Sequence, residues 1–223
     1  MMKRYTQKQI EKIMAGQAGW IQRLEEMYGI PRAYLQAVLF KEMTEINFVD
    51  TLADLAVKWY WLRYDFLSWF CCVLKRPPLH HFPGGLLKKR DSSTGYAQIF
   101  AYVAIRAMRY ALEKGLESSP VAFGFPEDHV PEEKDPADLG RVWQRLNGDP
   151  GFNLRMAALN LISAAEEMTG RIAFSSYSPA EIQLIFTRYN ANSRTVTAYG
   201  RETYQYYLAF SGKKQEDRET KAS

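Results

Sequence analysis

The sequence predicts a mainly α-helical protein. Apolar residues recur at helical spacing in nearly every periodic segment, helix-starting and helix-ending residues bracket these segments, and we find no clear β-hairpin. Of the 223 residues, 47% are hydrophobic and 24% are charged, which is typical of a globular protein. Aromatic residues make up 14% and are spread along the whole chain, which indicates a real core and a cleft lined with rings.

The first two helices are predicted from their apolar spacing and from the residues between them. A helix over about 5–27 carries Ile10 and its apolar neighbours inward, and Gly29 is its expected stop. Pro31 fits the first turn of the next helix, because its missing N–H would have had no helical partner there. We expect that second helix to run to about Met43.

The most hydrophobic stretch is DTLADLAVKWYWLRYDFLSWFCCVL, residues 50–74. Charged residues interrupt it at Asp54, Lys58, Arg63 and Asp65, so we do not expect it to span a membrane. The prediction is an amphipathic helix that packs into the core, and the alternative is a helix that binds a membrane surface or a partner. The loop-forming run KRPPLHHFPGG ends it.

The remaining helices are predicted from start and stop signals. They run from just after Gln98 to Gly115, from Asp149-Pro150 to Gly170, from a capping box at Ser178 to Tyr189, and over about 200–210. Residues 116–148 are predicted to be rich in loops. The whole is expected to be a single domain over 1–211, followed by a disordered polar tail over 212–223.

Charge and cysteine content exclude some classes of protein and leave others open. The net charge of +4 is compatible with an anionic polymer such as nucleic acid or cell wall but selects neither. Cys71 and Cys72 are adjacent, so no disulfide framework is expected. Three histidines without a C-x-x-C motif predict no metal site, and His80-His81 is expected to be a surface pair, with metal contact as its alternative. The N-terminus lacks an uninterrupted apolar core, so we expect no signal peptide and synthesis in the cytoplasm.

Four short stretches follow one another in an informative order. In AVLFKEMTEIN, Glu42 closes an apolar helix on the same face as its buried residues, where the common alternative is an ion pair. DSSTGYAQIF is a turn that delivers Gln98 to a helix start. DPGFNLRMAALNL begins a helix at Asp149, and RYNANSRTVTAYGRETYQYY holds a Tyr-Asn pair before a Tyr-Gly-x-x-Thr-x-x-Tyr run.

This order, over about residues 30–208, resembles the lysozyme-like superfamily, specifically its soluble lytic transglycosylase and goose-type lysozyme branch. The resemblance implies a lysozyme-like helical domain that cleaves the β-1,4 bond between N-acetylmuramic acid and N-acetylglucosamine in peptidoglycan, without a cofactor. It implies that Glu42 is the catalytic acid. The residues that it implies for substrate binding or positioning are Gly95, Gln98, Tyr189 and Asn190. Tyr96 and Tyr199 are candidates for stacking on sugar rings, with core packing as the alternative for both.

Three departures from the family's pattern bear on this expectation. Met43 stands where that family usually has Ser after the glutamate, and Asn192 replaces the glycine of its Y-N-x-G motif. An aromatic-rich insertion over about 50–90 adds roughly 40 residues between Glu42 and Gln98. A non-catalytic module that binds glycan or serves an assembly therefore stays open. A nucleic-acid-binding protein, which rests on mild basicity alone, is not expected.

A second carboxylate is needed if the reaction is hydrolysis with inversion, whereas lytic transglycosylases work with one glutamate. The candidates are Glu45, Asp50 and Asp91. Asp91 precedes the turn near the place where goose-type enzymes have an aspartate, although a turn-capping role is its ordinary alternative. If the chain acts on the cell wall, peptidoglycan strands are its expected partner, and its route there is release or an export or assembly partner.

Overall fold

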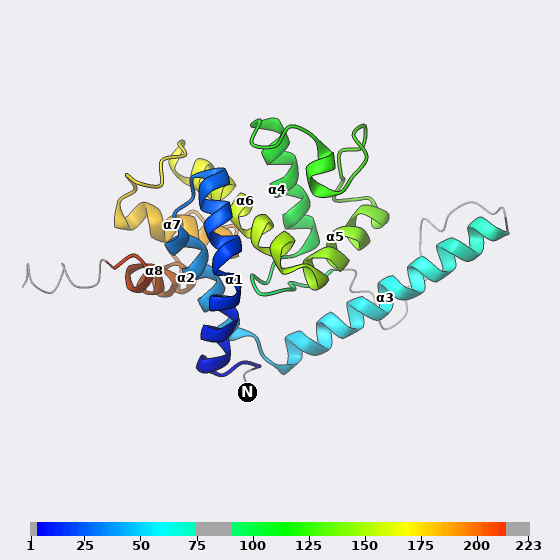
Figure 1. Ribbon diagram of the computed structural model, residues 1–223, viewed down its shortest axis with the longest axis horizontal. Coiled ribbons are helices and arrows are strands. Elements are labelled where there is room, and N and C mark those ends of the chain that lie inside the picture. Colours follow the sequence, from blue (N-terminus) through cyan, green and yellow to red (C-terminus); the bar gives the residue numbers. More distant parts are fainter. Residues whose placement is uncertain (1–3, 75–90, 213–223) are drawn as a thin grey trace, which may run out of the picture.

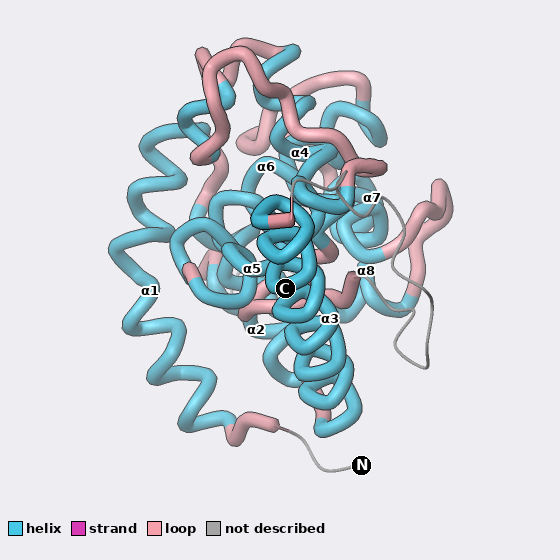
Figure 2. The backbone as a smooth tube through the Cα atoms, turned by 90° about the vertical axis from the view of Figure 1, so that its right-hand side faces the viewer, coloured by secondary structure: helices cyan, strands magenta, loops and turns pink. Residues whose placement is uncertain are grey.

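The structure, a computed structural model, describes residues 4–74 and 91–212. Within these ranges its regular elements are helices, and an isolated β-bridge joins Thr94 to Ile99. The elements are α1 (Gln7–Tyr28), α2 (Arg32–Glu45), α3 (Phe48–Val73), α4 (Ala101–Glu113), the 3₁₀-helix η1 (Pro120–Phe123), α5 (Pro136–Gly148), α6 (Pro150–Thr169), α7 (Pro179–Asn190) and α8 (Ala198–Phe210). The predicted mainly α class is confirmed (Figures 1 and 2).

Helix α6 lies at the centre of the helical body. Its apolar residues point in every direction and most are fully buried, which is the pattern of a helix surrounded by others. It packs against α4 and α5 on one side and against α1 and α7 on the other, while α2 and α8 complete the second group (Figure 1). The core therefore joins two groups of helices across α6.

Local signals place most helix ends where the sequence predicts them. Asp149 caps α6 by accepting from the Phe152 N–H, and Ser178 caps α7 in a capping box with Glu181. Gly29 ends α1 in the left-handed conformation that glycine adopts at little cost, and α6 ends in the same way at Gly170.

Two predicted features of the backbone are wrong. Pro31 is the capping residue before α2 and lies outside the first turn, because the helix begins at Arg32. Residues 116–148 hold more than loops, since the 3₁₀-helix η1 and the 13-residue helix α5 lie within them. Asp135 caps α5 and Pro136 opens it, the same Asp-Pro start that correctly predicts α6.

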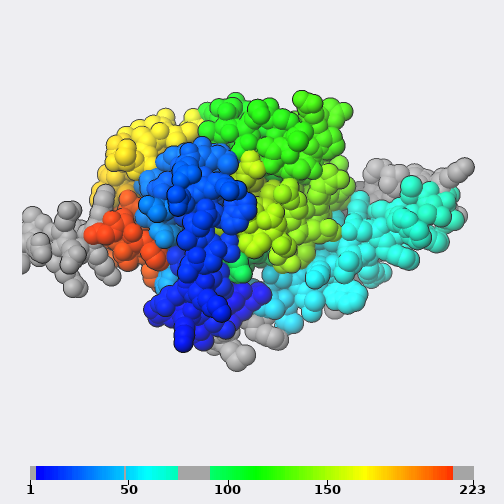
Figure 3. Space-filling model, viewed as in Figure 1, coloured from blue at the N-terminus to red at the C-terminus, as the bar shows by residue number. Residues whose placement is uncertain are grey.

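Helix α3 departs most from expectation. It was predicted to pack into the core, but it projects from the helical body along most of its length (Figures 1 and 3). One side is buried, through Val57, Tyr60 and Trp61, and a row of large apolar side chains on the other side is exposed. The prediction of a core helix is therefore wrong for all but that one side.

The insertion predicted over about 50–90 is described only as far as Leu74, so the His80-His81 pair lies outside the described residues. The tail predicted over 212–223 lies outside the described residues beyond Gly212. Cys71 and Cys72 are both free thiols. In the described part of the chain, no helix combines the length and the apolar content needed to cross a membrane.

Candidate active site

Glu42 lies in the last turn of α2, at the wall of a pocket. The helix carries Tyr34, Leu35 and Val38 into the core, and the carboxyl of Glu42 continues that face with only 9% of the residue exposed. The exposed edge opens into a cavity of about 270 Å³. This carboxyl is thus almost fully desolvated and still reachable from outside.

Burial dominates the electrostatics of Glu42. Removal from water disfavours the carboxylate and raises its pKa from 4.5 to about 8, with smaller upward contributions from the charges of Glu45 and Asp50. Two neighbours act in the opposite direction. The Tyr199 hydroxyl donates to Glu42 Oε1 at 2.5 Å, and the Lys41 ammonium attracts the charged form. The net result is a carboxylic acid that holds its proton at neutral pH.

Tyr199 is the hydrogen-bond partner of Glu42, and sequence reasoning proposed it only for sugar stacking or core packing. Its hydroxyl reaches Glu42 across the contact between α8 and α2, and α8 also lies very close to α7 at Gly200. A Cβ at Gly200 would lie 2.1 Å from Thr187 Oγ1 and 2.4 Å from the Gln183 carbonyl, so no larger residue fits. The signal in the sequence is the glycine directly after Tyr199.

The turn over 94–99 forms a second wall of the same pocket. Two backbone bonds join Thr94 and Ile99, and Gln98 has a positive φ of 45°, which among the described residues is shared only with glycines. Its side-chain amide donates to the Gly95 carbonyl at 2.8 Å, and its oxygen accepts from Ser93. This strained conformation presents Gln98 to the pocket that Glu42 lines.

Helices α6 and α7 hold that turn from two sides. Asn153 of α6 is fully buried, accepts from the Ala97 N–H at 2.9 Å and donates to the Thr94 carbonyl at 3.0 Å. Tyr189 of α7 donates to the Ala97 carbonyl at 2.8 Å. The turn therefore has little freedom to move relative to Glu42.

The pocket brings together residues that lie far apart in the sequence. Gln98 and Asn190, both predicted as substrate-binding, line it with Glu42. Tyr189 supports the turn through its bond to the Ala97 carbonyl and does not line the pocket. The remaining lining residues are Glu45, Ile46, Asn47, Asp50, Ser93 and Phe100.

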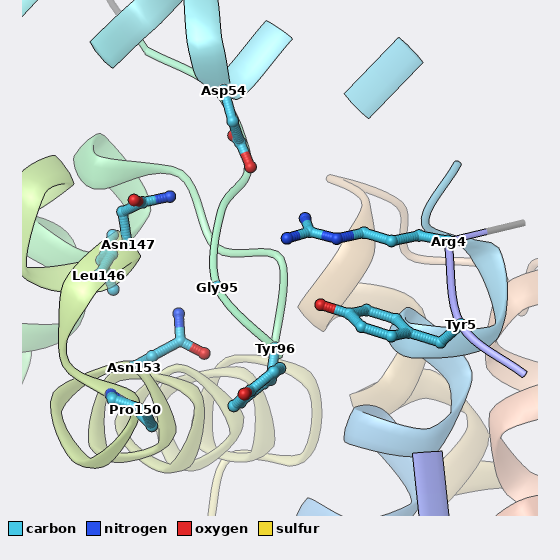
Figure 4. A pocket seen from close by; sticks show the side chains of 9 residues that line it. All are labelled: Arg4, Tyr5, Asp54, Gly95, Tyr96, Leu146, Asn147, Pro150 and Asn153. Carbon is cyan, nitrogen blue, oxygen red and sulfur yellow. The ribbon is translucent and has the colours of Figure 1, made fainter. Parts of the chain in front are cut away.

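Gly95 and Tyr96 lie elsewhere, so the structure does not bring these two predicted residues to Glu42. They line a different cavity of about 150 Å³, toward which Arg4 and Tyr5 point from the N-terminal segment (Figure 4). Gly95 has a structural task, since a Cβ there would lie 2.3 Å from the side chain of Asn153. Only glycine at this position leaves room for the Asn153 side chain to bond to Thr94 and Ala97.

The three candidate second carboxylates differ in their surroundings. Asp91 accepts from the backbone N–H groups of Ala101 and Tyr102 at 3.0 and 3.1 Å, so it caps the start of α4, and it does not line the pocket. Glu45 and Asp50 both line it. The ammonium of Lys41 holds Glu45 at 2.5 Å, and Asp50 accepts from the Asn47 N–H at 2.8 Å in the capping box of α3.

Comparison with protein-family models, with curated proteins and with solved structures finds no match to this chain. Among the described residues, no cluster of three or more His, Cys, Asp and Glu side chains is arranged to hold a metal ion. The site is therefore characterised by its geometry: a buried carboxylic acid, a tyrosine that donates to it, and amide side chains along an open pocket.

Proposed function

We propose that this protein is a peptidoglycan-cleaving muramidase that acts on the β-1,4 bond between N-acetylmuramic acid and N-acetylglucosamine. Its preferred reaction is that of a lytic transglycosylase, with Glu42 as general acid and base. The single observation that carries the proposal is the carboxyl of Glu42, which stays protonated at neutral pH at the wall of an open pocket. The order of motifs that resembles this family supports it.

The proposed reaction uses the carboxyl of Glu42 twice, first as an acid and then as a base. Glu42 gives its proton to the glycosidic oxygen, the bond from that oxygen to the muramyl C1 breaks, and N-acetylglucosamine leaves as an alcohol. The resulting carboxylate then takes the proton of the muramyl 6-hydroxyl, whose oxygen bonds to C1 and closes a 1,6-anhydro ring. The glutamate ends protonated again, so one carboxyl is sufficient.

The amides of Gln98 and Asn190 supply the polar contacts that a glycan needs. A primary amide both donates and accepts, which suits the acetamido and hydroxyl groups of the sugars. Tyr199 keeps the Glu42 carboxyl in one position, since its hydroxyl donates to Oε1. Tyr189 and Asn153 act through the turn that carries Gln98, and are positioning residues.

Hydrolysis is the related alternative, and it requires a base that holds a water. Asp50 and Glu45 are its candidates, because both line the pocket that contains Glu42. Asp91 is not retained for this role, since its carboxylate caps α4.

A non-catalytic lysozyme-like module that binds glycan is the second candidate function. Met43 favours it, because this residue is fully buried and offers no hydroxyl where relatives carry Ser. Asn192 is exposed and its φ is not positive, so this turn works without the family's glycine. In this reading the pocket holds a sugar strand, and the buried acid serves recognition only.

The deciding experiment is mass spectrometry of the products released from purified peptidoglycan sacculi. Wild type, Glu42→Gln and Asp91→Asn are compared, and the last variant is a matched carboxyl-to-amide change outside the pocket. We expect anhydro-muropeptides from the wild type and from Asp91→Asn, and none from Glu42→Gln. Reducing-end products lost in Glu42→Gln would mean hydrolysis, whereas no soluble product with retained binding to sacculi would establish the non-catalytic module.

A further inference from the structure

The exposed side of α3 carries its large apolar residues in a regular row. We call this row the α3 seam: Leu52, Leu55, Trp59, Leu62, Phe66 and Trp69. Each of the six is about half exposed or more. In sequence they are separated by 3, 4, 3, 4 and 3 residues, the spacing at which apolar residues face a partner helix in a coiled coil.

The opposite side of α3 fixes the seam to face outward. Trp61 and Val57 lie half a turn away from the seam and are buried. The ring of Trp61 packs directly on Gly140 of α5, where a Cβ would come within 2.7 Å of the ring. Gln144 of α5 also donates to Asp65 at 2.9 Å, and Asp65, which remains exposed, marks the border between this side and the seam. α3 is therefore anchored to α5 by one side and projects from the helical body (Figure 1), while the seam residues on its other side are exposed.

We propose that the α3 seam binds the same seam of a second copy of this chain, with the two helices antiparallel. A two-fold axis midway between residues 60 and 61 places Trp59 opposite the partner's Leu62. The same axis places Leu55 opposite the partner's Phe66 and Leu52 opposite the partner's Trp69. Each layer pairs a large ring with a leucine, so the row complements itself.

Charges beside the seam select the antiparallel arrangement. Lys58 and Asp65 are seven residues apart and lie on the same flank of the seam, with Arg63 on the other flank. In the antiparallel pair, Lys58 and the partner's Asp65 meet on one flank, and the symmetry repeats this contact. A parallel pair would instead bring Lys58 to the partner's Arg63, two like charges.

A second flank supports the same register. Val49 and Phe70 lie on the flank that carries Arg63, and both are exposed. The same two-fold axis brings Val49 to the partner's Phe70. Val49 and Phe70 therefore contact each other across the dimer only when the two helices run in opposite directions.

A membrane surface fits this helix less well than a second copy does. Helices that lie on membranes carry an excess of Lys and Arg on their polar face. α3 has three aspartates, at 50, 54 and 65, against one lysine and one arginine, so it carries a net negative charge. Its row of apolar residues also follows the 3.5-residue period of a helix-to-helix contact.

The test is sedimentation equilibrium of the full chain over a wide range of concentration. We expect a monomer–dimer equilibrium that Leu62→Glu abolishes. Val121→Glu, a matched change at an exposed apolar residue outside the seam, should leave it unaltered. Far-UV circular dichroism of each variant checks that the helices are intact, which is expected because both side chains are exposed.

A charge exchange tests the direction of the helices. Lys58→Glu should weaken the dimer about tenfold, because it replaces two attractions by two repulsions. The double variant Lys58→Glu/Asp65→Lys should recover the affinity. Tighter association of Lys58→Glu would indicate the parallel pair and overturn the proposal. A wild type that stays monomeric also overturns it, and cosedimentation of that monomer with anionic vesicles, lost in Leu62→Glu, would assign the seam to a membrane.

Discussion

At the scale of single residues, the candidate site depends on a competition between burial and hydrogen bonding at Glu42. Burial raises the pKa of this carboxyl, and the Tyr199 hydroxyl lowers it by donating to the charged form. Burial has the larger effect, so the pKa stands near 8. A carboxyl whose pKa is above the ambient pH is suited to giving up a proton in a reaction.

Tyr199→Phe tests this competition. The ring stays in place and the donor is lost, so the pKa of Glu42 should rise further and the carboxyl should lose its fixed orientation. We expect the rate of product formation to fall about tenfold, because the geometry of proton transfer is less well held. The alkaline limb of the pH–rate profile should start near pH 8 in the wild type and move upward in the variant. An unchanged limb would contradict the proposed contact.

Asp91→Asn separates a capping role from a catalytic one. Asp91 accepts two backbone N–H groups at the start of α4, and an amide can satisfy only one of them while placing an NH₂ group against the other. We expect a loss of about 1–2 kcal/mol in the free energy of unfolding, measured in urea. Product formation per folded molecule should remain near the wild-type level. A loss of activity without a loss of stability would return Asp91 to the reaction.

At the scale of elements, the turn over 94–99 shows how packing fixes a strained segment. Asn153 and Tyr189 reach the turn from two helices and bond to both sides of its backbone. Gly95 makes room for this support, because it has a φ of 73° and no Cβ to meet Asn153. The turn thus keeps Gln98 at the pocket, where its side chain bonds to Ser93 and to the Gly95 carbonyl.

Gly95→Ala should destabilise the protein by roughly 3 kcal/mol or more, because its Cβ would add a clash to an unfavourable φ. Gly16→Ala is the matched change. Gly16 is exposed inside α1 and has open space around it, so alanine there should add about 0.5–1 kcal/mol to the free energy of unfolding. Urea unfolding of both variants measures the contrast, and equal effects would mean that the turn is not held as described.

The elements also show what the sequence could and could not predict. Caps such as Asp149 and Ser178 act within a few residues, so they predict helix ends well. The same kind of start at Asp135-Pro136 was hidden by the acidic, proline-rich segment before it, so α5 was missed. Periodicity predicts that α3 is a helix, but it cannot tell which side meets the body, because both sides are apolar.

The site was predicted in part, for a related reason. Glu42, Gln98 and Asn190 line one pocket, as the order of motifs led us to expect. The bond from Tyr199 to Glu42 depends on the packing of α8 against α2, which joins residues 157 positions apart. Separations of that size leave no periodic trace in a sequence. Tertiary contacts of this kind had to come from the structure.

At the scale of the whole molecule, Glu42 should make stability depend on pH in an unusual direction. Its pKa is about 8 in the folded state and near 4.5 when the chain unfolds. Between these values the folded protein keeps the proton and the unfolded chain releases it. The unfolded state therefore binds fewer protons, and the free energy of unfolding falls as pH rises across this window. The carboxyl should cost the fold roughly 3–5 kcal/mol above pH 8.

Glu42→Gln isolates this contribution, because an amide does not titrate and its oxygen can still accept from Tyr199. At pH 5 the variant and the wild type should have similar free energies of unfolding in urea. From pH 5 to pH 8 the variant should become progressively more stable than the wild type, by roughly 3–5 kcal/mol at the end. All other titrating groups are common to the two proteins, so their effects cancel in the difference. A difference that does not change with pH would mean that Glu42 is ionised in the folded protein, and the proposed acid would be lost with it.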